Sequence, residues 1–252
     1  MAQRLLVVTA HPDDESGAFG GALLLAHRAG AETSLLCFTD GQAAHFRGDA
    51  ADDAELARMR RTELEAACDV LGVTRCEVLP YPDGALAEQS FLELTGVVVE
   101  RIRRWRPQVV LTFGADGAVN LHRDHTTVAL VTTAAFHWAG RAELFPETGA
   151  AWSPQKLYWS SPPFVSVRGR PELTAEAATV PWSLELRLGA LADEKLAAFG
   201  KHTSQQAVLE RVGRENVRKG MGSERYLLVA HRGLTSVTAD ASIFDGIVTE
   251  GD

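Results

Sequence analysis

The sequence predicts an α/β protein with a Rossmann-like, mostly parallel β-sheet, helices on both faces of the sheet and an irregular C-terminal cap. In the first half of the chain, short apolar and β-branched runs alternate with longer segments of helical periodicity, which is the pattern of consecutive β–α–β units. The chain has 252 residues, of which 46% are hydrophobic and 23% charged, as expected for a globular protein with a sizeable core.

Four strands and four helices account for the first half of the chain. The strands are expected at residues 4–9, 33–39, 76–80 and 108–113, and the helices at residues 16–29, 53–71 and 91–105 and from residue 125 onward. Strands that are separated by helices run parallel in one sheet. Ligands of such sheets bind at the carboxyl ends of the strands.

The second half of the chain is less regular, with six prolines between residues 146 and 181. Strands are expected at residues 155–160 and 225–230, and amphipathic helices at residues 184–201 and 205–218. Because no repeat, low-complexity tract or linker separates the halves, we expect a single domain over residues 1–252. Residues 1–139 would form the regular α/β core, and residues 140–252 the cap, the C-terminal helices and the last strand.

Composition and charge narrow the class of partner. Lysine and arginine number 25 against 33 acidic residues, a formal net charge of −8, which disfavours binding to a nucleic-acid backbone. No apolar run reaches the ~18 residues of a membrane-spanning helix, and the N-terminus lacks the pattern of a signal peptide. We therefore expect a cytoplasmic protein that binds neither nucleic acid nor membranes. Whether it forms a homo-oligomer is left open.

A cluster of polar residues directly follows the first predicted strand. It consists of His11, Asp13, Asp14 and Glu15, with a proline after the histidine. Turn formation alone would explain one or two acidic residues at the end of a strand. Three consecutive acids beside a histidine repel one another, which raises their pKa values unless a cation is present. This cluster therefore indicates a cation site.

A second cluster, His122-Arg123-Asp124-His125, follows the fourth predicted strand. His122 and His125 are three residues apart, so they share one face of a helical turn. Two histidines and one carboxylate with an open fourth position form a typical catalytic zinc set. The His-Glu-x-x-His spacing of zincin metalloproteases is absent from the sequence, which excludes that class.

These two motifs together resemble those of the PIG-L (LmbE-like) family, zinc hydrolases that remove N-acyl groups, typically acetyl from N-acetylglucosamine-type sugars. Further segments resemble the family's other motifs: Arg60-Arg61-Thr62-Glu63-Leu64, Tyr81-Pro82-Asp83-Gly84, Lys195, and His202-Thr203-Ser204-Gln205. The resemblance covers most of the chain except residues 140–182, for which no motif matches.

The resemblance implies a role for each residue of the two clusters. The ligands of one Zn²⁺ per chain, with Fe²⁺ or another divalent ion as alternatives, would be His11, Asp14 and His125. Asp13 would be the general base. His122 would stabilise the oxyanion or protonate the leaving amine, and Asp124 would orient His122 and favour its protonated form.

Three residues are candidates for contacts with substrate. Arg60 and Glu63 lie within the apolar face of the helix at residues 53–71, where a charged side chain needs a partner. They either form an internal ion pair or place Arg60 against the sugar, with Glu63 holding it. The resemblance implies that Asp83 contacts substrate hydroxyls, and Asn120 could donate to the acyl oxygen. The mycothiol-pathway branch of the family has tyrosine at the position of Asn120.

The sequence therefore predicts a metal-dependent N-deacetylase that acts on an amino sugar or glycoconjugate. One alternative is an amidase that cleaves a larger amide such as a thiol conjugate, and another is a non-catalytic metal- or sugar-binding protein. A dinucleotide-binding oxidoreductase is disfavoured, because the first strand leads into His-Pro-Asp-Asp-Glu and not Gly-x-Gly-x-x-Gly. Lys195 and His202 are expected to be a snorkelling lysine and a satisfied histidine. His45 has no assigned role.

Overall fold

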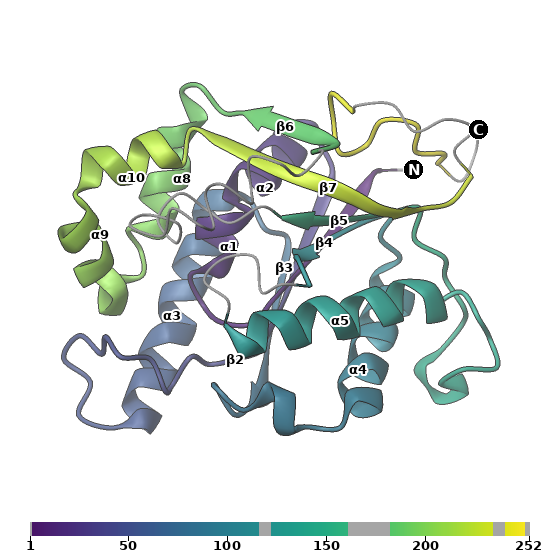
Figure 1. The fold of residues 1–252 in the computed structure, drawn as a ribbon, viewed down its shortest axis with the longest axis horizontal. Helices are drawn as coiled ribbons and strands as arrows, with labels where there is room; N and C mark the ends of the chain where they lie inside the picture. Colours follow the sequence, from purple (N-terminus) through teal and green to yellow (C-terminus); the bar gives the residue numbers. More distant parts are fainter. Residues whose placement is uncertain (1, 116–121, 161–181, 234–239, 250–252) are drawn as a thin grey trace.

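A single mixed β-sheet forms the centre of the molecule (Figure 1). The computed structural model describes residues 2–115, 122–160, 182–233 and 240–249. Within these residues the strand order is β3-β2-β1-β4-β5-β7-β6. The strands are β1 (Arg4–Thr9), β2 (Glu32–Thr39), β3 (Arg75–Tyr81), β4 (Val109–Phe113), β5 (Lys156–Ser160), β6 (Leu184–Arg187) and β7 (Ser223–His231). Strands β1 to β5 pair in parallel, and β7 is antiparallel to both of its neighbours. The predicted α/β fold with a mostly parallel sheet is confirmed.

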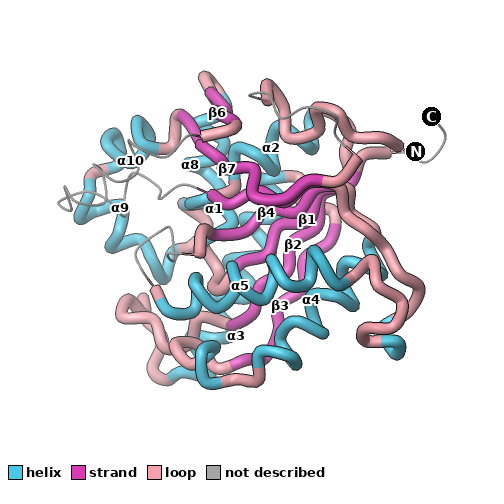
Figure 2. The backbone as a smooth tube through the Cα atoms, turned by 45° about the vertical axis from the view of Figure 1, so that its right-hand side comes forward, coloured by secondary structure: helices cyan, strands magenta, loops and turns pink. Residues whose placement is uncertain are grey.

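Helices cover both faces of the sheet (Figure 2). The larger ones are α1 (Asp14–Ala18), α2 (Gly20–Arg28), α3 (Asp53–Leu71), α4 (Phe91–Trp105), α5 (Arg123–Trp138), α8 (Leu191–Phe199), α9 (Gln206–Val212) and α10 (Arg214–Gly220). Short 3₁₀ turns are η1 (Leu86–Glu88), η2 (Pro146–Thr148) and η3 (Thr203–Gln205). Helices α4 and α5 pack against each other on one face, whereas α2, α3 and α8 contact one another on the opposite face. None of these described helices combines the length and apolar character needed to cross a membrane.

The order of the strands defines where a ligand can bind. From β1 the chain moves outward through β2 to β3, and it then returns to the other side of β1 to form β4. The carboxyl ends of β1 and β4 therefore lie next to each other where the direction of winding reverses. In open α/β sheets this switch point forms the crevice that binds ligands. Both polar clusters of the sequence follow these two strands.

The buried face of α3 carries charged residues, as the helical periodicity predicts. The helix begins at Asp52, whose carboxylate accepts a hydrogen bond from the Glu55 amide at 2.8 Å, and it ends at Gly72 with a φ of 71°. Only glycine adopts this left-handed conformation readily. Arg60 and Glu63 are buried among the apolar residues of α3.

The expected helix over residues 184–201 is wrong in its first part. Leu184 and Leu186 are buried and their neighbours Glu185 and Arg187 are exposed. This alternation is that of a strand with one buried face, and the segment pairs with β7 as β6. Gly189, with a φ of 54°, separates β6 from the helix that follows.

Two other expected helices are each divided into two. The segment 16–29 breaks at Phe19, which leaves the helical conformation between α1 and α2. The segment 205–218 breaks at Gly213, whose φ of 86° ends α9 before α10 begins. In both cases a single residue outside the helical region of φ and ψ interrupts the ladder of hydrogen bonds.

The region without a matching motif, residues 140–182, is described as far as residue 160. Its beginning is held by the buried guanidinium of Arg103, which donates hydrogen bonds to the carbonyl oxygens of Ala139, Arg141, Leu144 and Phe145. The segment then enters the sheet as β5. Residues 161–181 lie outside the described part of the chain.

Candidate functional site

The loop after β1 turns sharply at Asp13, which has a φ of 104°. Non-glycine residues with a positive φ are strained and cluster at functional sites. The turn is held by backbone contacts: the Asp13 carbonyl accepts a hydrogen bond from the Gly17 amide at 2.8 Å. Asp14 begins α1, and its carboxylate accepts a hydrogen bond from the His11 amide at 2.8 Å.

Three buried side chains meet between the ends of β1 and β4. The Nδ1 atom of His11 lies 3.2 Å from Nε2 of His125 and 3.5 Å from Oδ2 of Asp14, and Nε2 of His125 lies 3.3 Å from Oδ1 of Asp14. The relative exposure of these three residues is 9% or less. The neighbouring His125 and His11 outweigh the effect of burial and hold the pKa of Asp14 well below its ordinary value.

The spacing of these atoms fits a metal ion. Zinc ligands at ~2.0–2.2 Å in a tetrahedral arrangement lie ~3.3–3.6 Å from one another. The two histidine nitrogens are close to this spacing at 3.2 Å, and the Asp14 carboxylate reaches each of them through a different oxygen, at 3.5 and 3.3 Å. Two imidazole nitrogens and one carboxylate oxygen are also suitable donors for zinc or iron. Two other groups of side chains have donor atoms close enough for a cation: His11 with His122 and His125, and His11 with Asp83 and Asp124.

The second of these groups has a simpler explanation, because it faces the other nitrogen of His11. Nε2 of His11 lies 2.9 Å from Oδ1 of Asp83 and 3.3 Å from Oδ2 of Asp124. A histidine that binds a metal through one nitrogen usually donates its other N–H to a carboxylate, which fixes the orientation of the ring. Asp83 and Asp124 are therefore placed to orient His11 for binding through Nδ1.

Asp83 and Asp124 thus make contacts that the sequence did not predict. Each carboxylate also accepts backbone hydrogen bonds, Asp83 from Ala43 at 3.0 Å, and Asp124 from Gly84 at 2.7 Å and Leu86 at 3.1 Å. The Asp83 carboxylate thus contacts His11, and its expected contact with substrate hydroxyls stays a prediction. Likewise, the Asp124 carboxylate contacts His11, although it was expected to orient His122.

His122 lies beside this group and is partly exposed. It precedes α5, where its Nδ1 accepts a hydrogen bond from the Asp124 amide at 3.2 Å, and its ring centroid lies 4.8 Å from that of His11. Burial and the nearby His11 and His125 lower the pKa of His122, against a raising effect of Asp124. Asp124 therefore acts on the pKa of His122 in the expected direction, but burial and the two other histidines outweigh it.

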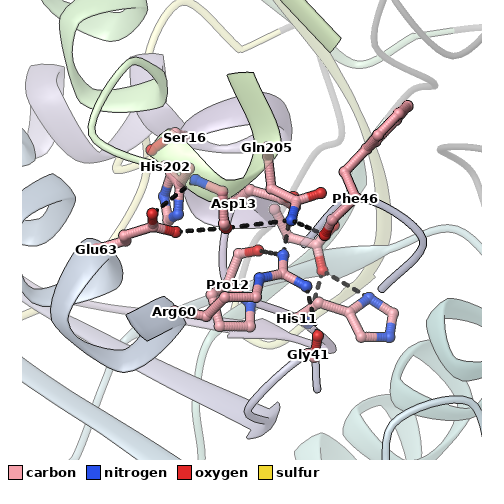
Figure 3. A network of polar contacts seen from close by, with 12 residues as sticks. His11, Pro12, Asp13, Ser16, Gly41, Phe46, Arg60, Glu63, His202 and Gln205 are labelled. Carbon is pink, nitrogen blue, oxygen red and sulfur yellow. Dashed lines mark hydrogen bonds and ion pairs between the residues drawn. The ribbon is translucent and has the colours of Figure 1, made fainter. Parts of the chain in front are cut away.

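The Asp13 carboxylate lies against Arg60 (Figure 3). Arg60 donates from its Nη2 to Oδ2 of Asp13 at 3.0 Å and to the Pro12 carbonyl, and from its Nη1 to the Gly41 carbonyl at 2.8 Å. Burial raises the pKa of Asp13 to about 6, although Arg60 opposes this effect. A carboxylate with a pKa in this range suits proton transfer near neutral pH.

Arg60 and Glu63 do not form the internal ion pair that was one of the two expected alternatives. Among the described contacts, Arg60 binds the loop after β1, whereas Glu63 accepts hydrogen bonds from Thr203 Oγ1, the Ser204 amide and Ser204 Oγ at 2.6–2.7 Å. The second alternative, a sugar contact by Arg60, stays a prediction, because the described contacts of Arg60 hold the Asp13 loop.

The other singled-out residues have clear positions. Lys195 does not snorkel: it is 2% exposed and its Nζ lies 2.5 Å from Oε1 of Glu224. His202 is buried and bonded, as expected, but it lies at the start of η3 and not on a helix. His45 is exposed and packs against the ring of Phe46. Asn120 lies outside the described residues.

The sequence named Glu15 and His202 separately, but it did not predict that they form a buried pair at the site. Oε1 of Glu15 lies 2.7 Å from Nε2 of His202, and both side chains are 0% exposed. The local signals were the third consecutive acid of the His-Pro-Asp-Asp-Glu motif and the histidine of the segment at residues 202–205. The two lie 187 residues apart, a distance at which local sequence patterns carry no information on pairing.

The fold and these contacts define an α/β protein with a candidate metal centre at the switch point of a parallel sheet. The chain belongs to the PIG-L family, described as GlcNAc-PI de-N-acetylase, whose pattern matches residues 6–136.

Individual relatives agree with this assignment. A 1D-myo-inositol 2-acetamido-2-deoxy-alpha-D-glucopyranoside deacetylase of Rhodococcus jostii (strain RHA1) is 36% identical over 182 residues, which is 63% of this chain and 61% of the relative. A mycothiol S-conjugate amidase of Streptomyces coelicolor is 29% identical over 62% of this chain and 60% of the relative. The matched segment thus spans about three fifths of the length of each of these relatives.

A solved structure shares the fold over nearly the whole chain. N,N'-diacetylchitobiose deacetylase from Pyrococcus horikoshii superimposes with a TM-score of 0.74 over 90% of this chain and 84% of that one, at 19% identity. The predicted relation to the PIG-L family is confirmed.

Proposed function

We propose that this protein is a metal-dependent hydrolase that removes the N-acetyl, or a related N-acyl, group from an N-acetylglucosamine-type sugar or glycoconjugate. The observation that carries the proposal is the meeting of the His11, Asp14 and His125 side chains at the switch point of the sheet: the two histidine nitrogens lie 3.2 Å apart, and each lies within 3.5 Å of one oxygen of the Asp14 carboxylate. A carboxylate, Asp13, and an imidazole, His122, flank these atoms.

The chemistry follows from the residues around the three donors. A divalent ion held there, zinc in the first instance, would polarise the amide carbonyl and lower the pKa of the attacking water. Asp13 accepts the proton of that water. Arg60 keeps the Asp13 carboxylate in place by donating a hydrogen bond to its Oδ2 atom at 3.0 Å.

His122 is assigned to the amide group of the substrate. As a partly exposed imidazole beside the donor atoms, it donates a hydrogen bond to the oxygen that gains negative charge, or a proton to the departing amine. Asp83 and Asp124 hold the ring of His11. Substrate contacts by Arg60, Asp83 and Asn120 remain part of the proposal, and the contacts described above assign the first two an additional positioning role.

The named relatives support an amino-sugar substrate. The Rhodococcus relative is named as a deacetylase of an acetamido-sugar linked to inositol. The Streptomyces relative, named as an amidase of a mycothiol S-conjugate, favours the second candidate function, cleavage of a larger amide such as a thiol conjugate. Both reactions hydrolyse an amide, so the same residues serve either one.

The test combines elemental analysis of the purified protein with an assay of free-amine release. The substrates are N-acetylglucosamine, several of its glycosides including an inositol glycoside, and a thiol-conjugated amide. About one zinc or iron per chain, with amine release that a chelator abolishes and added metal restores, is the expected result. Release from the thiol conjugate alone would select the second candidate. A protein that holds no metal after reconstitution would contradict both.

A further inference from the structure

A chain of buried polar contacts connects the loop after β1 to the C-terminal part of the protein (Figure 3). The two oxygens of Glu15 have different partners. Oε1 lies 2.7 Å from Nε2 of His202 and also accepts from the hydroxyl of Ser16. Oε2 accepts a hydrogen bond from the backbone amide of Asp13 at 2.9 Å. Glu15 thus joins His202 directly to the backbone of Asp13.

The backbone of Asp13 needs such support, because its φ of 104° is unfavourable for a residue with a side chain. Such a conformation persists only where the surroundings hold it. Arg60 holds the Pro12 carbonyl on one side of Asp13. The Glu15 carboxylate holds the Asp13 amide itself.

His202 is in turn held by the segment that follows it. Ser204 donates both its amide and its hydroxyl to Glu63 of α3, each at 2.7 Å. Gln205 donates to the Phe46 carbonyl at 2.9 Å. The segment at residues 203–205 is therefore hydrogen-bonded both to α3 and to the loop after β2. These contacts fix the position of the His202 ring beside Glu15.

We propose that His202 and Glu15 are positioning residues, which keep the Asp13 carboxylate in the geometry required of a general base. The proposal rests on the function proposed above. His202 does not touch the reacting atoms: it acts through Glu15 on the Asp13 amide.

A second buried pair in the same half of the protein provides a comparison. Glu224 binds Lys195 at 2.5 Å and accepts hydrogen bonds from the amides of Gly21 and Ala22 in the first turn of α2. Glu224 is 6% exposed. It accepts hydrogen bonds from two backbone amides, whereas Glu15 accepts one, from Asp13. Because it holds α2 and not Asp13, its loss is expected to reduce stability without changing turnover by the folded enzyme.

The experiment compares His202→Gln, Glu15→Gln and the double variant with Glu224→Gln as the matched control. Two readouts are used: steady-state kinetics of amine release, and hydrogen–deuterium exchange of the peptide that contains residues 11–17. We expect each single variant to lower kcat by about 10- to 100-fold, the effect of a small misplacement of a catalytic group, with little change in KM. We also expect faster exchange of the Asp13 segment.

The two residues act on Asp13 through one and the same chain of contacts, so the double variant is expected to lose less kcat than the product of the two single losses. Glu224→Gln should leave kcat and the exchange of residues 11–17 unchanged. Metal content, measured in every variant, should stay at the wild-type level. If His202→Gln does not fold, Ser204→Ala takes its place, because it removes the hydrogen bond from the Ser204 hydroxyl to Glu63. This variant should lower kcat and speed up the exchange of residues 11–17 as well, but by less than expected for His202→Gln.

Unchanged exchange of residues 11–17 in folded His202→Gln would overturn the proposal, as would an equal loss of kcat in Glu224→Gln. Loss of metal in His202→Gln would also overturn it, because the pair would then support the metal ligands. If the wild-type protein releases no amine from any substrate, the proposed function fails. The exchange measurement still tests whether His202 holds the Asp13 backbone.

Discussion

Replacing Arg60 with methionine is expected to reduce both stability and turnover. The side chain is 3% exposed and donates to two carbonyl oxygens and to the Asp13 carboxylate. Methionine preserves the apolar stem within α3 and removes all three hydrogen bonds. The Asp13 carboxylate then loses its positive partner, and the Pro12 and Gly41 carbonyls lose a donor.

The magnitude follows from how deeply these groups are buried. Removing one partner of a buried ion pair costs about 3–5 kcal/mol. The Asp13 side chain is 26% exposed, so water partly replaces the arginine, and the lower end of that range applies. For a chain of about this length, ~3 kcal/mol lowers the melting temperature by ~6–12 °C. Because the base is also displaced, kcat should fall by up to the ~10²–10⁴-fold that general-base catalysis contributes.

The assay is thermal unfolding together with kcat and KM for amine release, measured on the metal-loaded protein. Arg60→Lys is the charge-preserving control, and it should recover little, because one ammonium group does not reproduce the fork of a guanidinium. Gly41→Ala tests the same interaction from the other side, since a methyl group there would lie 2.1 Å from Nη1 of Arg60. A raised KM with unchanged kcat in Arg60→Met would refute this reasoning and favour the sugar contact.

Three further predictions test the roles of single residues. Asp13→Asn should retain the metal and lose about 10²–10⁴-fold in turnover, as measured by elemental analysis and kinetics; loss of metal and activity in parallel would show that Asp13 is itself a ligand. His125→Ala should lose the metal, and a full complement of metal in this variant would exclude it as a ligand. Burial lowers the pKa of His202, but Glu15 outweighs burial and raises it above its ordinary value of 6.5. The stabilising contribution of His202 is therefore fully present below pH 6.5 and is lost as the pH rises through the raised, folded-state pKa. Urea unfolding should show a larger destabilisation by His202→Gln at about pH 6 than at about pH 9, and a difference of the opposite sign would refute the assignment.

The sequence alone predicted the α/β architecture and the neighbourhood of the site. Short β-branched runs and helical periodicity are local properties, and they predict the strands and helices. Because parallel strands end at the same edge of a sheet, these elements also predict where the two polar clusters lie. For this reason His11 and His125, which are far apart in the chain, could be expected to meet. The helical spacing of α3 likewise placed Arg60 and Glu63 on its buried face. The same local reasoning failed for residues 184–187, because an apolar and polar alternation this short fits a helix or a strand until a partner strand is present.

The partners of the buried charges were decided only by the tertiary structure. Periodicity showed that Arg60 and Glu63 are buried, but it left an ion pair between them as an alternative. In the folded protein Glu63 binds Ser204, 141 residues further along the chain, and Glu15 binds His202. The carboxylates of Asp83 and Asp124 similarly face His11. A buried charge must be satisfied by a group that packing brings within hydrogen-bond distance, and the sequence near each residue does not contain that group.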